Sequence, residues 1–381
     1  MPKEPVAAAL ARLSKAQAKF AAELNALSDS HAASSEWASA GIAAVVRLCH
    51  DPASAADAAA TLSNLSYADD TNDDRIREAG AIPALVGLLT GGATWGPVAG
   101  PLLMAMGAGM GGIEEEAAGH AAFALGNLSH SNKANSVATL GAGAIPPLVA
   151  LLSGGPKSKA AADAARALAS LALNIAAAIT EAGAIAPLVA LLSGGPKSEA
   201  AGPAASALTS LALNITANKA AIIEAGAIPP LVALLSGGAD SEAADNAASA
   251  LSVLACGTNP TAVLEEIARK QIDLSSWPIL RERLCKRASA GLLAAEAGTA
   301  VAALERAITL AAAVQMDAAD LERAQKRLRV INGDAERQER RESFGLGSLE
   351  LPDEFVCPIT MEKMRGAAAA LAARITRAPP H

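Results

Sequence analysis

The sequence predicts an all-α protein that folds as a solenoid of repeated short helices. The phrase Ala-Gly-Ala-Ile-Pro-Pro-Leu-Val-Ala-Leu-Leu occurs at residues 142–152 and 225–235, and close variants occur at 79–89 and 182–192. From residue 142 onward successive copies start 40 and 43 residues apart, a spacing typical of helical repeats, and the longer step of 63 residues before it contains an insertion. The composition is 52% hydrophobic but only 2% aromatic. Alanine and leucine therefore supply the apolar surface, which favours closely packed helices.

Composition also limits the functions that this chain can have. The formal net charge of −7 argues against a basic surface that binds nucleic acid. The scarcity of aromatic residues argues against an aromatic-lined cofactor pocket, so we expect no cofactor. The longest uncharged stretch, residues 90–113, holds eight glycines and two prolines, so we expect no membrane span there. The four cysteines form no Cys-x-x-Cys pair, which predicts a reducing compartment and a cytoplasmic or nuclear location.

The N-terminal residues 1–40 are predicted to form a capping helix. This stretch is rich in alanine and carries Arg12, Lys15 and Lys19, which would also suit a transit peptide. Glu4 and Glu23 lie in the same stretch and favour the capping helix.

Each unit of the array, residues 41–258, is predicted to contain three helices, with about five units in all. A short first helix ends at a glycine such as Gly226, because glycine adopts the left-handed conformation at least cost. The second helix begins with a proline pair such as Pro229 and Pro230, where a missing N–H costs nothing. A Ser-Gly-Gly sequence ends it, and an alanine-rich third helix follows.

Three irregularities interrupt the period. Residues 93–112 form an insertion that we expect to be a flexible loop, with contact to a partner as the alternative. The step from Leu171 to Gly183 is 12 residues, whereas the step from Leu128 to Gly143 is 15, so this unit is three residues short. The first unit, marked by a weak copy at Gly41, has lost residues between its second and third helices.

The repeated phrase and the Ala-Leu-x-Asn-Leu sequence after it resemble the armadillo repeat family over residues 41–256. The resemblance implies an armadillo-type right-handed α-solenoid whose third helices line a concave groove for protein or peptide cargo. In that family an asparagine of the third helix faces the groove and bonds the peptide backbone. Asn64 and Asn127 match this asparagine. Ser170 and Ser210 occupy the same aligned position, or column, in the third helices of two later units. The alternative is that both asparagines are satisfied polar helix positions.

After residue 258 the repeat is lost, and residues 259–345 are predicted to form a helical hairpin or short coiled region. Helices are expected at residues 261–272, 279–287, 298–314 and 318–331. The pair Glu322 and Lys326 has the favourable order of an acid four residues before a base.

No catalytic or metal site is predicted. The two Gly-Gly-Pro-Lys-Ser loops, at residues 154–158 and 194–198, place proline where a phosphate-binding loop needs glycine, so they are interpreted as repeat loops. The five histidines lack metal-ligand spacing. Glu114, Glu115 and Glu116 are interpreted as the start of a third helix, where acids favour the helix dipole.

Residues 349–364 contain Asp-Glu-Phe-Val-Cys-Pro-Ile-Thr, which resembles the opening of a U-box, the zinc-free domain of some ubiquitin ligases. The resemblance implies that Ile359 contacts a ubiquitin-conjugating enzyme. Seventeen residues follow Met364, whereas a U-box core needs roughly 70 residues. We therefore expect an incomplete U-box start and a disordered or helical tail at residues 365–381.

These patterns predict a protein–protein interaction scaffold of the U-box ubiquitin-ligase type, which binds its substrate in the armadillo groove. Whether the chain is itself a ubiquitin-protein transferase is left open by the short U-box segment. The alternative is a stand-alone armadillo scaffold, a catenin-like or importin-like adaptor with no link to ubiquitin.

Overall fold

The computed structural model describes residues 35–51, 54–68, 71–90, 110–213, 215–238, 240–256, 260–298 and 300–343. The regular structure in these ranges is helical, as the sequence predicts. Residues 1–34 of the predicted capping helix, most of the insertion, and the whole of the U-box-like segment and tail lie outside the described residues.

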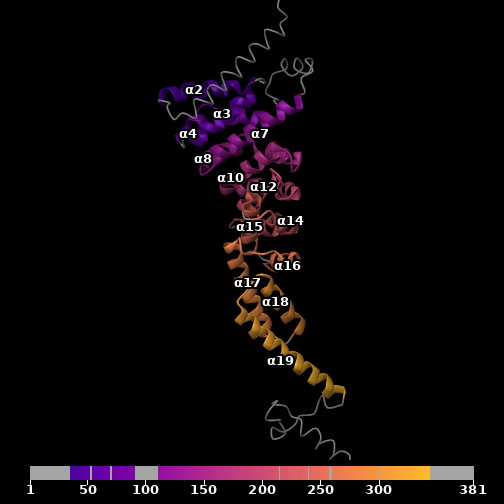
Figure 1. Ribbon diagram of the computed structural model, residues 1–381. Coiled ribbons are helices and arrows are strands. Elements are labelled where there is room, and N and C mark those ends of the chain that lie inside the picture. The colour runs from indigo at the N-terminus through magenta and orange to yellow at the C-terminus, as the bar shows by residue number, and fades with distance from the viewer. Residues whose placement is uncertain are drawn as a thin grey trace, which may run out of the picture. The chain divides into compact units, whose positions relative to one another are not determined.

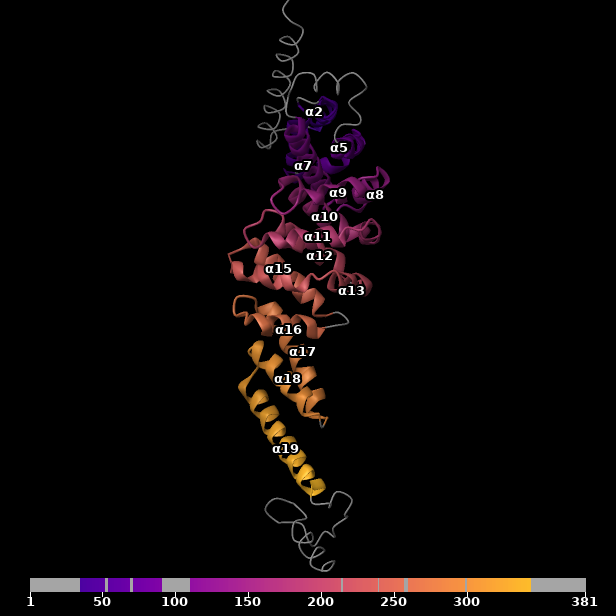
Figure 2. The same cartoon turned by 90° about the vertical axis from the view of Figure 1, so that its right-hand side faces the viewer.

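The helices of the array fall into three classes (Figures 1 and 2). The first helices are α4 (Thr71–Glu78), α8 (Lys133–Gly141) and α13 (Thr216–Glu224). The second helices are α2 (Ser35–Leu48), α5 (Ala81–Leu89), α9 (Ile145–Leu151), α11 (Ile185–Leu191) and α14 (Ile228–Leu234). The third helices are α3 (Ala55–Ala68), α7 (Met110–Ser129), α10 (Lys159–Glu181), α12 (Ala201–Ala212) and α15 (Glu242–Leu254).

The predicted helix breaks are confirmed by the backbone. Gly226 has φ +79°, and Gly80, Gly143 and Gly183 adopt the same left-handed conformation. The proline pairs lie in the first turn of α9 and α14. Gly41, the weak first copy, instead lies inside α2. Alanines follow it where the other units have proline, so nothing there interrupts the helix.

The predicted three-residue deletion changes the local fold. We expected separate third and first helices before Gly183, but α10 continues to Glu181 with a kink at Ile175. The missing residues are those that would form the connecting loop. By length and composition, α10 is the single described helix apolar enough to cross a membrane, and two bent pairs, α8–α9 and α13–α14, pass the same test together. Here the apolar surface of α10 packs against α7 and α12.

The loop expected over residues 93–112 does not extend to residue 112. Helix α7 already begins at Met110, so Gly111 and Gly112 are helical and do not form a helix-ending pair. Glu114, Glu115 and Glu116 consequently lie beyond the first turn of α7 and do not open it. The remainder of the insertion lies outside the described residues.

The third helices pack on one another in chain order, α3 on α7, α7 on α10, α10 on α12 and α12 on α15. Alanines and leucines of these helices, such as Leu168 and Leu208, are fully buried. Gly126 allows α7 to lie close to α10, because a Cβ placed on it would lie 2.9 Å from the Cα of Ala167. Small residues inside the helices, as well as in the loops, therefore fix the spacing between neighbouring units.

A second set of asparagines holds the first helices to the third. The Nδ2 atoms of Asn72, Asn135 and Asn218 donate to the carbonyl oxygens of Leu65, Leu128 and Leu211, at 2.9, 2.8 and 2.8 Å. These carbonyls belong to the last turns of α3, α7 and α12, where the helix leaves them unpaired. In the shortened unit the corresponding position, seven residues after Leu171, is Ala178, and α10 is continuous there.

The stack continues beyond the last recognisable copy of the phrase. Helix α16 (Pro260–Lys270) packs against α14 and α15. At the start of α17 (Pro278–Glu296), Trp277 donates through Nε1 to Asp245 of α15 at 3.2 Å, and Arg283 donates to the carbonyl of Ser252 at 3.1 Å. The described residues divide into two compact units within α17, after Ala288, and residues 313–315 belong to the first unit.

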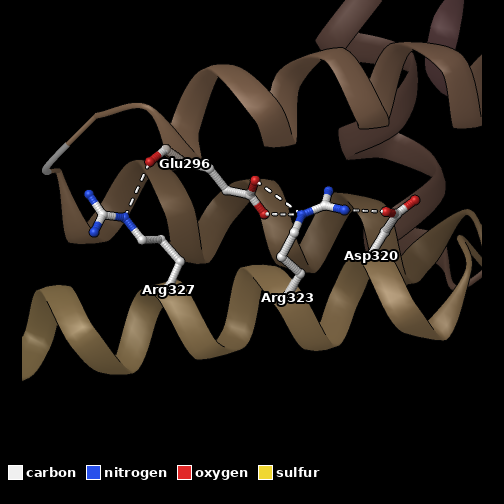
Figure 3. Close-up of polar contacts among 4 residues, drawn as sticks. All are labelled: Glu296, Asp320, Arg323 and Arg327. Atoms are coloured by element: carbon white, nitrogen blue, oxygen red, sulfur yellow. Dashed lines mark hydrogen bonds and ion pairs between the residues drawn. The ribbon is translucent and has the colours of Figure 1, made fainter.

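The second unit contains the end of α17 with α18 (Val301–Ala313) and α19 (Ala318–Ser343). Figure 3 shows Arg323 of α19 between two carboxylates, with Glu296 at 3.4 Å and Asp320 at 2.7 Å. Arg327 donates to the backbone carbonyl of Glu296 at the end of α17. Both α17 and α19 are longer than the sequence predicts. These contacts join α19 to the end of α17.

Candidate functional site

Three adjoining hollows lie over the third helices of the first unit. The acidic hollow, about 260 Å³, lies between α7 and α10. The central hollow, about 670 Å³, extends across α10, α12 and α15. The asparagine hollow, about 280 Å³, reaches from α7 to α15. Lys159 lines the first two, and Arg166 the last two. We call this surface the third-helix groove.

The groove brings Asn127 and Ser170 together in the asparagine hollow. Asn127 is half-buried, and its Nδ2 donates to Ser63 Oγ of α3 at 2.9 Å. Its Oδ1 accepts no hydrogen bond from the described residues. One half of this amide is therefore satisfied within the stack, and the other half is a free acceptor on the groove.

The other predicted groove residues are placed differently. Asn64 and Ser210 are half-buried on α3 and α12, and neither lines the three hollows. Asn64 is also already engaged in an interaction of its own. Ile359 lies outside the described residues. The roles of these three residues stay predictions.

Two groove residues were missed by sequence reasoning. Phe123 lies one helical turn before Asn127 and remains 37% exposed in the asparagine hollow. Arg166 occupies the same repeat position on α10, two residues before its motif leucine, Leu168, as Phe123 is before Leu125. Aligning the units one turn upstream of the asparagine column would have found both residues.

Asp163 is the buried charge beside the groove. It is 4% exposed, and its Oδ1 accepts a hydrogen bond from Nη1 of Arg166 at 2.8 Å. Burial raises the pKa of Asp163, and the nearby charges of Arg166, Lys159 and His120 oppose that shift without cancelling it. Because the folded-state pKa lies above the unfolded value, stability falls as the pH rises through this range and Asp163 ionises.

The Gly-Gly-Pro-Lys-Ser loops stack on each other, which supports their interpretation as repeat loops. Ser158 caps α10 by accepting from the Ala161 N–H. Ser198 donates to the carbonyl of Pro156 in the preceding loop. A Cβ on Gly194 would lie 2.5 Å from the Pro156 ring, so the loops pack in direct contact. Within the described ranges no three His, Cys, Asp or Glu side chains are placed to hold a metal ion.

Comparison with known proteins agrees with this helix order. Residues 216–256, from the first helix α13 to the end of the third helix α15, match the Armadillo/beta-catenin-like repeat. The match and the three-helix units together define the fold as an all-α armadillo-type solenoid. No curated protein matches the chain.

Several solved structures are similar to the chain. An engineered protein is 27% identical, with 72% of this chain and 96% of that chain covered and a TM-score of 0.49. A computationally designed armadillo repeat protein for modular peptide recognition is 25% identical, with 71% and 99% covered and a TM-score of 0.47. A designed armadillo repeat protein in complex with the peptide (KR)4 is 23% identical, with 72% and 99% covered and a TM-score of 0.46.

Proposed function

We propose that this protein is an interaction scaffold that binds an extended peptide segment of a partner protein in the third-helix groove. One observation carries the proposal: the three hollows adjoin across α7, α10, α12 and α15 and share lining residues. An extended peptide needs a long surface of this kind, with hydrogen-bonding groups for its backbone and contacts for alternate side chains.

The asparagine hollow has the chemistry for such a ligand. An extended backbone presents N–H groups that lose water on binding and need acceptors. The free Oδ1 of Asn127 is one acceptor, and the Ser170 hydroxyl can donate or accept. The exposed ring of Phe123 offers apolar contact area beside them. Arg166 uses only Nη1 on Asp163, so its other N–H groups remain available to the groove.

Replacing Asn127 with alanine is expected to weaken binding of a groove peptide several-fold, about 1 kcal/mol for one hydrogen bond. The probe is a fluorescein-labelled peptide selected from a displayed random library against the full chain, with affinity measured by fluorescence polarisation.

The matched control for this prediction is Ser63→Ala. It removes the hydroxyl that accepts from Asn127 Nδ2, leaves the Ser63 carbonyl oxygen 3.4 Å from the same atom, and does not change the groove acceptor. We expect it to leave peptide affinity near that of the unmodified chain. Equal affinity of N127A and the unmodified chain would remove Asn127 from the site, and failure to select any peptide would contradict the scaffold proposal itself.

We further propose that the partner held in the groove is a ubiquitination substrate, and that Ile359 contacts a ubiquitin-conjugating enzyme. The support is the Asp-Glu-Phe-Val-Cys-Pro-Ile-Thr sequence within residues 349–364. The alternative remains a stand-alone adaptor without ubiquitin machinery. Such ligases act by bringing two partners together, so no catalytic side chain is required of this chain.

Discharge of ubiquitin from a charged conjugating enzyme tests this second proposal. The chain as it stands is compared with a version that carries a completed U-box after residue 364. We expect faster discharge with the completed version, and loss of that gain when Ile359 is replaced by alanine. Background rates with both versions would leave the stand-alone adaptor as the function.

We propose a cytoplasmic or nuclear location on the cysteine usage. The three cysteines within the described residues, Cys49, Cys256 and Cys285, are unpaired thiols. Burial raises the pKa of Cys49 to about 12, which keeps it protonated and unreactive.

A further inference from the structure

The second helices of the array form a continuous row. Helix α5 contacts α9, α11 contacts the 3-10 turn η1 (Leu152–Gly154), and α14 contacts the 3-10 turn η2 (Leu192–Gly194). Figure 2 shows α5, α9 and α11 following one another down the array. The row consists of residues 81–90, 145–154, 185–194 and 228–237, which we call the second-helix face.

The second-helix face carries no charged side chain, although 18% of the chain is charged. Its exposed side chains are short and mostly apolar, and the same types recur in successive helices: Pro83, Pro146, Ala150, Ala186, Ala190, Pro229 and Ala233. The third helices differ, since Lys159 and Glu242 are exposed on them. Contiguous apolar surface that extends over four helices marks an interaction site.

The polar side chains of this face make their hydrogen bonds within it. The hydroxyls of Ser153, Ser193 and Ser236 each donate at 2.7 Å to the carbonyl oxygen three residues earlier. Thr90 donates in the same way to the carbonyl oxygen of Gly87 at 2.9 Å. A polar group that already has a hydrogen bond loses little when water leaves it, so covering this face has a low desolvation cost.

Charged residues border the second-helix face along two opposite edges. Glu181 and Glu224 are exposed and lie four residues before α11 and α14 begin. Lys157 and Lys197 are exposed and lie three residues after η1 and η2 end, whereas Asp240 has the matching position after α14. The edge where the helices begin is therefore acidic, and most of the edge where they end is basic.

We propose that the second-helix face docks on the same face of a second copy of this chain, an inference that goes beyond peptide binding in the groove and does not rest on it. A two-fold axis along the array sets the second helices of the two copies antiparallel, so the acidic edge of each copy meets the basic edge of the other. The spacing of the helices matches by symmetry. Because the chain has a net charge of −7, two copies repel each other through their acidic surfaces, and this uncharged face avoids that repulsion.

The size of the face fits a weak, specific dimer. Four helices that pack about 9 Å apart and are each about 14 Å long cover about 500 Å² per copy. A total of about 1,000 Å² lies at the lower limit for a specific interface, where complexes are usually transient. We therefore expect a dissociation constant in the range of about 10–100 μM.

Sedimentation velocity of the full chain, over about 1–300 μM, tests this proposal, and we expect a shift from monomer to dimer. Ala190→Glu places a carboxylate on α11, an inner helix of the row, and should weaken association at least about tenfold because the charge would be buried without a partner. The matched control is Ala134→Glu, which adds the same charge at an exposed position of α8 and should leave association unchanged. Thermal melting checks that both variants are folded.

Charge reversal tests the orientation of the two copies. Glu181→Lys brings lysines together where an acid and a base should meet, and is expected to weaken association about fivefold. Adding Lys157→Glu to the same chain restores pairs of opposite charge, so association should return to within about twofold of the unmodified chain. A double variant as weak as E181K would overturn the two-fold arrangement.

A chain that stays monomeric at every concentration, or a dimer that A190E does not weaken, would overturn the proposal. A monomer that cosediments with phosphatidylcholine vesicles, and loses this with A190E, would assign the face to a lipid surface instead. A monomer in which a photo-crosslinker at residue 150 captures residues 1–34 of its own chain would assign the face to the N-terminal segment. Groove-peptide affinity of A190E should equal that of the unmodified chain, so failure of the dimer and failure of the proposed function are seen separately.

Discussion

Replacing Gly126 with valine is expected to lower the free energy of unfolding by about 2–3 kcal/mol, the typical cost of overpacking. The cause is the close contact of α7 with α10, where a Cβ on Gly126 would lie 2.9 Å from the Cα and 3.3 Å from the N of Ala167. Both atoms are backbone, so the added methyl groups can be accommodated only if the two helices separate. The gain in helix propensity over glycine, a few tenths of a kcal/mol, is too small to compensate.

The control for this prediction is the same substitution at Gly141, the last residue of α8, where a Cβ would meet nothing within 4 Å. We expect Gly141→Val to change stability by no more than about 0.5 kcal/mol. Both variants are followed by circular dichroism during thermal and urea denaturation. Because solenoids can unfold in segments, hydrogen exchange in α7 and α10 should accompany the melting curves. Equal stability of the two variants would show that α7 and α10 are not held at this spacing.

Asn218→Ala is expected to cost about 1–3 kcal/mol, the penalty for leaving a buried carbonyl unpaired. Asn218 is 5% exposed, and its Nδ2 is 2.8 Å from the carbonyl oxygen of Leu211 in the last turn of α12. The substitution removes the donor but leaves the acceptor buried. The same bond joins α13 to α12, so amide protons of α13 should exchange faster in the variant.

Thr216→Ala provides the comparison, because Thr216 is an exposed residue at the start of the same helix. We expect its effect on the urea midpoint to stay within about 0.5 kcal/mol. A melting temperature of N218A equal to that of T216A would contradict the role given to the buried asparagines. It would also mean that the loop between α12 and α13 holds its position without them.

The expected behaviour of Asp163 runs opposite to that of Gly126 and Asn218. Those two residues stabilise the stack, whereas burial makes the ionised form of Asp163 a cost to it. A charge kept in a costly position is a common feature of functional sites. The variant D163N should therefore melt no lower than the unmodified chain, whereas substitutions at Gly126 and Asn218 should lower the melting temperature.

Much of the fold could be predicted because its signals are local. The left-handed conformation at Gly226 and the proline pair that opens α14 are properties of those residues and their immediate neighbours. The arithmetic of the repeat also located the deletion before Gly183. In the structure α10 continues through a kink at Ile175 instead of ending in a loop. The residue spacing alone could not predict this, because it depends on how the chain connects the two helical segments.

The candidate site was predictable only in part. Asn127 and Ser170 were found from their column, and the structure places both in one hollow. The Ser63 partner of Asn127 could not be inferred, because it comes from the preceding unit and depends on how α3 packs against α7. Phe123 and Arg166 carried a sequence signal that needed the units to be compared one turn further upstream.

By itself, the sequence determined an all-α repeat and its helix boundaries near glycine and proline. Only the tertiary structure decided which atoms remain available in the groove, such as the Oδ1 of Asn127. The physical reason is distance along the chain. Helix ends depend on the φ and ψ preferences of a few adjacent residues, whereas the chemistry of a groove atom depends on neighbours from the next unit, such as Gly119 over Asp163.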